Sequence, residues 1–354
     1  MIDLTDKFWS YFTYDLGIDL GTANTLVFVK GKGIVVREPS AVAQHKKTKK
    51  VIAIGREAKQ MMGKTPVNLV TIKPLRDGVI SDFEIAEAML KFFIHRVHQA
   101  PQLFPPKIPR PRVVIGVPYG ITEVERKAVV DAVMKGGARK VFLLEEPMAA
   151  AIGAGLPIED ASGSMIVDIG GGTSEIAVIS LGGIVASRSV RVAGSKMDES
   201  IVEWARQKHN LLIGEHTAER AKIMVGRVGN YSKLSKEIAI RGRDLVSGLP
   251  KEVKISSGDV AEAIASPVEV ILENIRQTME ETPPELLSDL LRSGVVLAGG
   301  GSLLAGMDQA IASAIQMPVV RAEDPQTAVV RGCGKVLEDL TLLRRVLLAG
   351  PWYV

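Results

Sequence analysis

The chain of 354 residues contains a single cysteine, Cys333. One cysteine excludes an intramolecular disulfide framework and is typical of a protein from a reducing compartment. Aromatic residues make up only 5% of the chain, while 46% of it is hydrophobic and 24% is charged, which is a globular composition. A chain of this length can form two domains, each with its own core.

Long apolar runs are also missing. No stretch approaches the ~18 residues that a membrane-spanning helix needs, and the N-terminus lacks the basic region and apolar core of a secretory signal. The net charge is only +4, and the Lys and Arg residues are scattered. Because a nucleic-acid footprint needs clustered basic residues, we expect no nucleic-acid partner. The single cysteine and the lack of a secretory signal predict a cytoplasmic location.

Several familiar catalytic motifs are absent. Gly63-Lys64-Thr65 resembles the end of a P-loop, but Ala58 stands where the first glycine is required. No G-x-G-x-x-G follows the first apolar run, which argues against a dinucleotide-binding fold. The five scattered histidines and the lone cysteine offer no zinc-binding spacing. No serine has the context of a nucleophile elbow.

A repeated pattern is present instead. Ile18–Asn24 and Val167–Thr173 each consist of a β-rich run that ends in an aspartate and a turn of small residues, followed by another β-rich run. This pattern predicts two β-hairpins whose tips offer backbone N–H groups, with Asp19 or Asp168 at the base. Successive N–H groups in a tight turn bind anions, and glycine lets a phosphate approach the backbone closely.

A third glycine turn, 299–302, follows the apolar run Val295–Ala298 and is expected to begin a helix, which would place amides at an anion site. Together the three turns predict a nucleotide-phosphate site. Asp19 and Asp168 would act there mainly through Mg²⁺ and its waters, because magnesium keeps several waters and takes few carboxylates.

Hydrolysis of a nucleotide also needs a group that orients the attacking water. Glu145 and Glu146 follow the expected strand Val141–Leu144 and supply acidic candidates. The alternative is that these two carboxylates belong to a solvated strand edge or to the start of a helix.

Two segments carry apolar residues that suggest membrane contact. Residues 1–14 form an amphipathic helix on a helical wheel, with Phe8 and Trp9 on its apolar half. The proline-rich loop 101–111 excludes helix and central strand, which favours an exposed position for Leu103 and Phe104. The alternative for each segment is packing on its own domain, or on a neighbouring subunit for the first.

The other expected elements come from periodicity and capping residues. Residues 197 to about 257 are expected to be mostly helical, then more polar and glycine-rich. The chain also predicts helices over 81–97, 123–135 and 266–280, and strands over 34–36, 51–54 and 113–117.

Several stretches resemble the actin-like ATPase superfamily and, within it, the MreB family of bacterial actins. The resemblance runs from about residue 15 to residue 345. It is carried by Asp19–Thr25, Arg37–Ser40, Arg76–Ile80, Val114–Pro118, Glu145–Gly153, Asp168–Thr173, Thr217–Arg220 and Gly299–Ser302.

The resemblance implies an α/β, actin-like fold: two ribonuclease H-like halves, in four subdomains, around a nucleotide cleft. It assigns 15–39, 80–159 and 329–354 to subdomain IA, 40–79 to IB, 160–196 and 258–328 to IIA, and 197–257 to IIB, after the N-terminal segment 1–14.

The resemblance also implies the roles of site residues toward ATP and Mg²⁺. Glu146 and Thr173 match the pair that positions the hydrolytic water, and Asp168 is counted with them as catalytic. The first phosphate loop is Gly21, Thr22, Ala23 and Asn24; the second is Gly170, Gly171, Gly172 and Thr173; Glu219, Arg220 and Lys222 border the adenine and ribose; and Gly299, Gly300, Gly301 and Ser302 form the adenosine-side turn.

The function implied is that of ATP-dependent, paired antiparallel filaments on the inner face of the cytoplasmic membrane, which organise cell-wall elongation. The implied partners are other copies of the chain, the membrane surface, a transmembrane adaptor such as RodZ, and MreC and MreD. Leu103 and Phe104 correspond to the membrane-insertion loop. One departure lies beside the second phosphate loop, where Ser195 replaces the acidic residue that usually follows Gly194.

Two other functions of the same superfamily stay open. A small-molecule kinase would need a base and polar groups for an acceptor, and neither can be assigned. A chaperone ATPase would normally carry a peptide-binding domain after the ATPase module.

Overall fold

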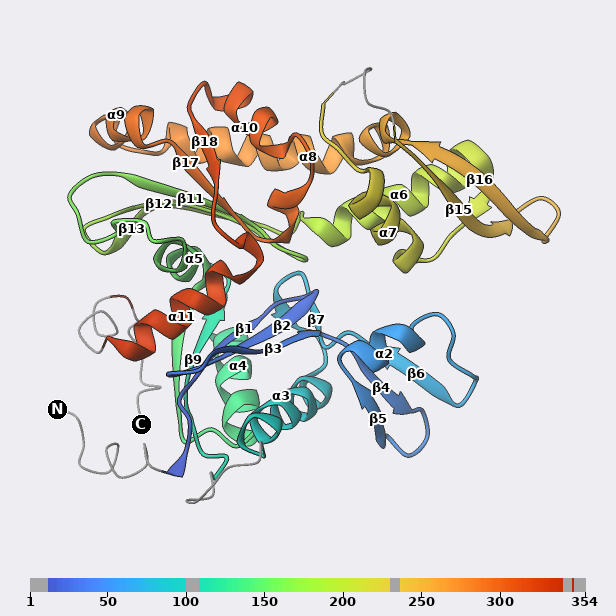
Figure 1. Cartoon of the computed structure of the whole chain (residues 1–354), viewed down its shortest axis with the longest axis horizontal. Coiled ribbons are helices and arrows are strands. Elements are labelled where there is room, and N and C mark those ends of the chain that lie inside the picture. Colours follow the sequence, from blue (N-terminus) through green and yellow to red (C-terminus); the bar gives the residue numbers. More distant parts are fainter. Residues whose placement is uncertain (1–11, 100–107, 230–235, 340–345, 347–354) are drawn as a thin grey trace. The chain divides into compact units, whose positions relative to one another are not determined.

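The computed structural model describes residues 12–99, 108–229, 236–339 and 346, which form two compact units (Figure 1). Unit 1 comprises residues 1–160, 181–183 and 327–354, and unit 2 comprises residues 161–180 and 184–326. Phe8, Trp9, Leu103 and Phe104, the residues predicted to contact a membrane, lie outside the described residues. The division into four subdomains stays a prediction.

Each unit is built around a five-stranded sheet of the same topology. In both sheets three strands form an antiparallel meander, and two further strands run parallel to its first strand. The predicted hairpins β1–β2 and β11–β12 therefore occupy equivalent positions in the two sheets. Unit 1 has the order β10 (Lys140–Glu145), β9 (Arg112–Val117), β1 (Leu16–Leu20), β2 (Asn24–Val29), β3 (Gly33–Pro39); unit 2 has β13 (Gly183–Val190), β12 (Ser174–Ser180), β11 (Ser164–Ile169), β17 (Val295–Ala298), β18 (Val319–Arg321).

Alternation along β1 decides which helices cover each face of the sheet in unit 1. Leu16, Ile18 and Leu20 are buried in one cluster with α3 (Phe83–His98) and α4 (Glu123–Lys135). On the opposite face, α11 (Ala328–Glu338) packs closely against both β1 and α5 (Glu146–Ala154). Burial of each large aliphatic side chain contributes about 1.5–3 kcal/mol, so this alternation supplies much of the stability of the unit.

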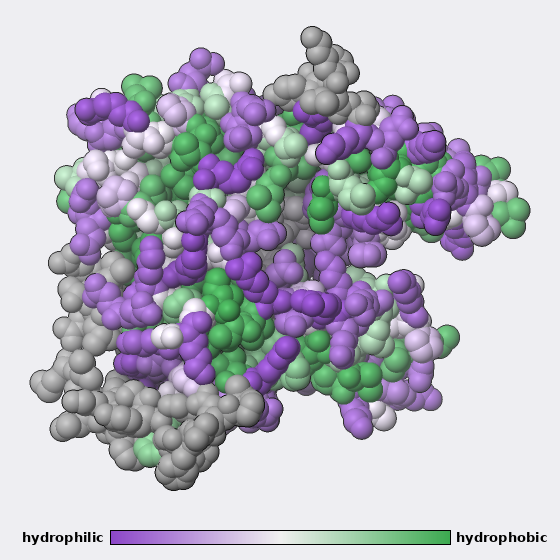
Figure 2. Space-filling view, in the orientation of Figure 1, coloured by the Kyte–Doolittle hydropathy of each residue, from purple (hydrophilic) through white to green (hydrophobic). Residues whose placement is uncertain are grey.

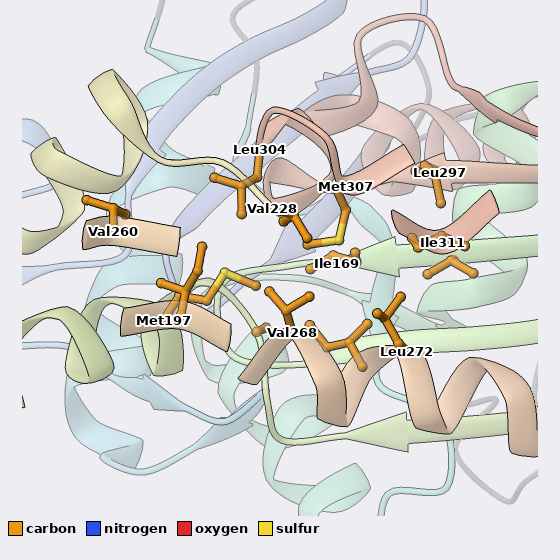
Figure 3. Packing of buried hydrophobic residues seen from close by; sticks show 14 of the residues in the cluster. Ile169, Met197, Val228, Val260, Val268, Leu272, Leu297, Leu304, Met307 and Ile311 are labelled. Carbon is orange, nitrogen blue, oxygen red and sulfur yellow. The ribbon is translucent and has the colours of Figure 1, made fainter. Parts of the chain in front are cut away.

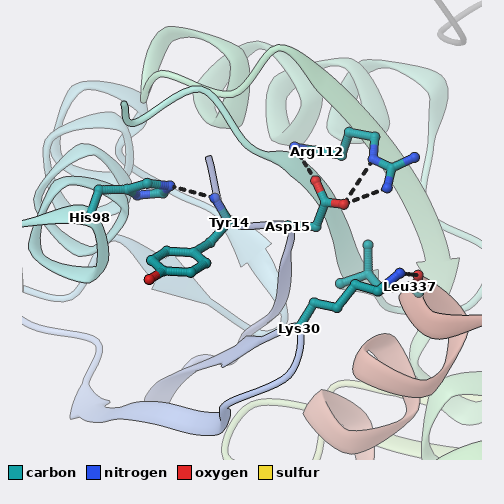
Figure 4. A network of polar contacts seen from close by, with 6 residues as sticks. All are labelled: Tyr14, Asp15, Lys30, His98, Arg112 and Leu337. Atoms are coloured by element: carbon teal, nitrogen blue, oxygen red, sulfur yellow. Dashed lines mark hydrogen bonds and ion pairs between the residues drawn. The ribbon is translucent and has the colours of Figure 1, made fainter. Parts of the chain in front are cut away.

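A polar network secures the beginning of β1 (Figure 4). Arg112 of β9 forms a buried ion pair with Asp15, with its Nε 3.1 Å from Asp15 Oδ2. The backbone N–H of Tyr14 donates to His98 Nε2 at 3.2 Å, and Lys30 Nζ donates to the carbonyl of Leu337 at 3.1 Å. The start of β1 is thereby tied to β9 and to α3.

In the sequence of unit 1, a group of short strands and one short helix comes between β3 and α3. The basic segment 46–50 makes the exposed turn between β4 and β5, as a solvated charge run would. The strand pair β7–β8 is joined by the turn Asp77-Gly78. The elements are β4 (Val42–His45), β5 (Val51–Ile54), α2 (Arg56–Met61), β6 (Leu69–Ile72), β7 (Leu75–Arg76) and β8 (Val79–Ile80).

The core of unit 2 lies where α6 (Gly194–His209), α8 (Ser257–Glu280) and α10 (Met307–Ile315) pack on one face of the sheet (Figure 3). Ile169 of β11 points into this cluster, together with Met197 of α6 and Met307 of α10. Asp168, next to Ile169 in the extended strand, therefore points to the other face.

Three expectations for unit 2 are wrong. Residues 197–257 are not mostly helical, because they also contain the hairpin β15 (Glu237–Asp244) and β16 (Pro250–Ser256), whose alternating isoleucines join the core. Helix α8 begins at Ser257, nine residues before the expected start, and accommodates Pro267 in its interior. The turn after β17 is a short 3₁₀ helix, η1 (Gly300–Leu303), and α10 begins only at Met307. The remaining elements are β14 (Leu211–Leu212), α7 (Glu215–Val225) and α9 (Pro284–Ser293).

The free end of the β15–β16 hairpin carries exposed apolar side chains, since Val246 is 81% exposed and Leu249 is 65% exposed. Figure 2 shows hydrophobic atoms among hydrophilic ones at this end. The turn itself is ordered, because Asp244 Oδ1 accepts the backbone N–H of Val246 at 2.8 Å. Among the described helices, none is both long enough and apolar enough to cross a membrane.

Candidate functional site

The first glycine turn closes the β1–β2 hairpin of unit 1, as predicted. Asp19 pairs with Leu26 across the hairpin, and the N–H of Gly21 donates to the carbonyl of Asn24 at 3.1 Å. This bond narrows the loop so that Thr22 and Ala23 form its tip. The four predicted loop residues thus form one tight turn with a carboxylate at its base.

Two residues outside the hairpin hold this loop, and neither of them was predicted to have a role. Ser40 Oγ donates to the carbonyl of Gly21 at 2.6 Å, and the Ser40 N–H donates to the carbonyl of Ala23 at 3.0 Å. The N–H of Gly78 donates to Thr22 Oγ1 at 3.0 Å. Ser40 and Gly78 both lie in stretches that carry the family resemblance, which was the available signal.

Glu146 is the first residue of α5, so the alternative that it marks a helix start is confirmed. A carboxylate there complements the positive end of the helix dipole. Glu146 and Asp19 both act on the buried thiol of Cys333, which lies 3.8 Å from the carbonyl oxygen of Ile18. Burial raises the pKa of Cys333 well above its usual value, and the negative charges of Asp19 and Glu146 raise it further. Asp19 and Glu146 therefore both lie close to the Cys333 thiol, within unit 1.

The neighbouring Glu145 precedes α5 and is partly buried. Desolvation raises the pKa of Glu145, and the positive charge of Arg126 partly counteracts this increase.

The second glycine turn, in unit 2, has the same internal bond as the first: the N–H of Gly170 donates to the carbonyl of Thr173 at 2.9 Å. Asp168 at its base is buried, and burial raises the pKa of this carboxyl from 3.8 to about 7. A carboxylate whose ionised form is this poorly solvated is typical of functional sites, since a bound cation reverses the penalty.

The third glycine turn approaches Asp168 from β17. A Cβ on Gly299 would lie 2.2 Å from Asp168 Oδ1 and 2.3 Å from the carbonyl oxygen of Ile169, and Gly299 has φ +77°. Only glycine satisfies both conditions. The side chain of Ser302 is buried and donates to the carbonyl of Gly299 at 2.7 Å, so it closes this turn internally.

The N-terminus of α6 contacts the second loop directly. The N–H groups of Gly194 and Ser195 donate to the carbonyls of Gly170 and Gly171, at 3.2 and 2.7 Å. No side chain caps this helix. The loop carbonyls therefore satisfy amides that a helix N-terminus otherwise leaves unpaired.

Helix α7 carries the three residues expected beside the adenosine. The segment after α7 bonds to the segment after η1, with the Val228 N–H 2.7 Å from the carbonyl of Ala305. This contact brings α7 and the turn 299–302 together. Arg220 is exposed, Glu219 is half-buried, and Lys222 is turned toward α6.

A second buried carboxylate in unit 2, Glu175, was not identified in the sequence analysis. It is the cross-strand partner of Asp168, so the two side chains lie on the same face of the sheet. Ser189 Oγ donates to Glu175 Oε1 at 2.7 Å, and Glu175 is 1% exposed. The available signal was the position of Glu175 seven residues after Asp168, across the predicted hairpin. Only the pairing register of β11 and β12 shows that the two carboxylates are neighbours.

The chain is similar to a known protein family over nearly its whole length. The family described as MreB/Mbl protein matches residues 13–345. The chain is 49% identical over 340 residues to the cell shape-determining protein MreB of Escherichia coli strain K12, covering 95% of this chain and 96% of the relative. It is 50% identical over 332 residues to the cell shape-determining protein Mbl of Bacillus subtilis strain 168, covering 94% and 98%.

Solved structures agree with these relatives. MreB5 of Spiroplasma citri bound to ADP is similar with a TM-score of 0.86 and 38% sequence identity, over 94% of this chain and 98% of that one. The AMPPNP-bound form of the same protein has a TM-score of 0.85 and 37% identity, with the same coverage. The predicted actin-like fold is confirmed by this similarity.

Proposed function

The chain belongs to the MreB/Mbl family, and from this membership and its two equivalent loops we propose that it is an ATP-dependent, actin-like filament protein that determines cell shape. The observation that carries the proposal is the duplication of one local geometry. Asp19 and Asp168 each precede a hairpin turn closed by the same backbone bond, in sheets of the same topology. A similar protein is bound to ADP and to AMPPNP in its structures, which supports a nucleotide as the ligand.

The residues of the two loops fit Mg-ATP by their chemistry. Tight glycine turns suit phosphate oxygens, and carboxylate oxygens from Asp19 and Asp168, through water, suit magnesium. The raised pKa of Asp168 supports this assignment, because a nearby divalent cation would favour its ionised form. Glu219, Arg220 and Lys222, with the turn 299–302, are proposed for the adenosine end.

Slow ATP hydrolysis is proposed to accompany polymerisation. When bound, Mg²⁺ neutralises charge that develops on the phosphates. Glu146 would orient the attacking water as a hydrogen-bond acceptor, and the hydroxyl of Thr173 would hold that water by a second hydrogen bond. We further propose that ATP favours the protomer that polymerises and that phosphate loss weakens filament contacts, a shift that requires different contacts in the two states.

Attachment to the inner face of the membrane is proposed through the N-terminal segment and the loop 101–111. The described ends of these segments meet in unit 1, because the Ile108 N–H donates to the carbonyl of Phe12 at 2.6 Å. Phe8 and Trp9 precede one end, and Leu103 and Phe104 precede the other. The described ends of the two segments are therefore adjacent, which supports the proposal that both act at one lipid surface.

The experiment that tests this function is negative-stain electron microscopy of the purified protein with Mg-ATP, with and without vesicles that contain anionic lipid. Paired filaments that lie on the vesicles are expected. Monodisperse particles under every condition, together with measurable ATP turnover, would contradict the filament function and favour the kinase alternative. Partners in cell-wall elongation, such as RodZ, MreC and MreD, are proposed from family membership alone.

A further inference from the structure

The segment 41–73, which contains β4, β5, α2 and β6, carries an excess of positive charge. Lysine and arginine occur throughout the chain, but this segment holds eight of them and only one acidic residue, Glu57. The whole chain has a net charge of +4, so the rest of the chain is net negative. The excess positive charge of the protein is therefore concentrated in one part of unit 1.

Half of these basic residues lie on the turn between β4 and β5, which carries Lys46, Lys47, Lys49 and Lys50. All four lysines are exposed, and within the described part of the chain none of them forms an ion pair. The turn is nevertheless ordered, because the His45 N–H donates to the carbonyl of Lys50 and the Lys49 N–H to the carbonyl of His45, both at 2.9 Å. His45 Nδ1 also accepts the backbone N–H of Lys47 at 3.3 Å. Four like charges are thereby held together on one backbone turn.

Exposed apolar side chains lie beside this turn. The Lys46 N–H donates to the carbonyl of Asn68 at 2.9 Å, which places the loop before β6 against the turn. Val67 of that loop is 89% exposed, and Ile52 of β5 is 49% exposed. Basic residues beside exposed aliphatic ones suit a membrane interface, where ammonium groups meet lipid phosphates and aliphatic groups reach the acyl boundary. The segment 41–73 contains no aromatic residue, so it lacks the stacking groups with which proteins bind single-stranded nucleic acid.

The β4–β5 pair lies on the same edge of unit 1 as α3. Strand β5 contacts α3, and Figure 1 shows the two elements side by side. On α3, Lys91 is exposed and Phe92 is 41% exposed, which adds one basic and one apolar group. Helix α3 ends at His98, shortly before the loop 101–111 that is proposed to contact the membrane. The charged turn and that loop are therefore connected through one helix.

We propose that the β4–β5 turn is a binding surface for anionic phospholipid, whose phosphate groups its four lysines recognise. The inference rests on the proposed attachment to the membrane and deepens it, because it names the lipid class and a contact outside the two apolar segments. A single weak apolar anchor gives only reversible binding, and a polybasic patch supplies the second signal that stable attachment needs. Because the rest of the chain is net negative, the turn also sets which side of unit 1 approaches an anionic surface.

The test measures co-sedimentation of the whole chain with vesicles of phosphatidylcholine, with and without phosphatidylglycerol. The wild-type protein is compared with a variant that combines Lys46→Gln with the same change at Lys47, Lys49 and Lys50. Each lysine near an anionic surface contributes about a fivefold gain in partition, so the variant is expected to bind phosphatidylglycerol vesicles on the order of 10²-fold less. Binding to phosphatidylcholine alone should be unchanged. Added salt should reduce the difference between wild type and variant, because it screens exposed charges.

The matched control removes the same positive charge from unit 2, by changing Arg206, Lys208, Lys254 and Arg292 to Gln. These four residues are exposed, and their loss should leave vesicle binding unchanged. Circular dichroism checks that both variants are folded. Electron microscopy of the lysine variant with Mg-ATP and no lipid should still show filaments, which separates lipid binding from contacts between copies of the chain.

Unchanged binding of the lysine variant to phosphatidylglycerol vesicles, or an equal loss in the unit 2 control, would overturn the inference and leave the proposed function standing. Loss of filaments without lipid would overturn it by making the turn a contact between copies of the chain. Tighter lysine-dependent binding to polyuridylic acid than to vesicles, at the same salt concentration, would assign the turn to nucleic acid instead. Wild-type filaments that bind no vesicles would remove the membrane attachment together with this inference, while the filament function would stand.

Discussion

Gly153 of α5 and Gly332 of α11 lie where the two helices of unit 1 make backbone contact. A Cβ on Gly153 would be 1.8 Å from the carbonyl oxygen of Ala328, and a Cβ on Gly332 would be 1.9 Å from that of Ala149. Real Cβ atoms do not approach backbone oxygens this closely, and neither oxygen belongs to a flexible side chain. This contact fixes the distance between α11 and α5, whose first residue is Glu146.

Gly332→Ala should therefore destabilise unit 1 by about 3 kcal/mol or more, because overpacking against backbone forces the helices apart. Thermal unfolding followed by circular dichroism should show a lower midpoint, by about 2–4 °C per kcal/mol. The control is Gly258→Ala in the first turn of α8, where a Cβ would meet only Ser256 Oγ at 3.5 Å. Unaltered stability of Gly332→Ala would mean that the helices separate at no cost.

Asp168→Asn should stabilise the nucleotide-free protein at neutral and alkaline pH. The folded pKa of Asp168 is about 7, above its ordinary value of 3.8, so the folded state binds the proton more tightly than the unfolded state. The stability of the wild-type protein therefore falls as pH rises from about 4 to about 7, and the full penalty remains above 7. Asparagine carries no charge and lacks this penalty.

The expected gain is largest above pH 7, at up to about 4 kcal/mol, and disappears toward pH 4. Urea unfolding at several pH values, in buffer with a metal chelator, measures it. Asp308→Asn, which changes a partly exposed carboxylate of the same unit, should alter stability by less than about 1 kcal/mol at every pH. A variant no more stable than the wild type at pH 8 would contradict the burial argument.

Glu146→Ala should retain ATP binding and lower the rate of phosphate release by on the order of 10² or more, as for loss of a group that positions water. Glu146→Gln should lower it less if orientation matters more than charge. Phosphate release and ATP binding are measured on the same samples. Glu123→Ala removes a carboxylate from the first position of α4, is a matched control, and should leave both unchanged. Retained turnover in Glu146→Ala would move the role to another residue.

Changing Leu103 and Phe104 together to Ser should abolish co-sedimentation with vesicles that contain anionic lipid, because the loop would lose its large apolar side chains. Polymerisation with Mg-ATP should persist. Phe8→Ser combined with Trp9→Ser tests the N-terminal segment separately. Vesicle binding that survives all four changes would remove both segments from the proposal.

The sequence alone determined the features that depend on neighbouring residues. The hairpins at Asp19 and Asp168 were predicted correctly because the aspartate, the small turn residues and the two β-rich runs are contiguous. Helix α4 was predicted to the residue, since Thr122 and Glu125 form a capping box. The hairpin β15–β16 was missed, because its alternating apolar positions are few and lie among many charged residues, and its isoleucines find apolar partners only within the core of unit 2.

The tertiary structure decided which distant groups meet at the candidate site. Gly299 lies against Asp168 only because β17 pairs beside β11, and Lys222 reaches Gly194 only because α7 packs against α6. A turn is specified by the torsional preferences of adjacent residues. A contact between residues far apart in the chain depends instead on how whole helices and strands pack, and no short segment of sequence specifies that packing.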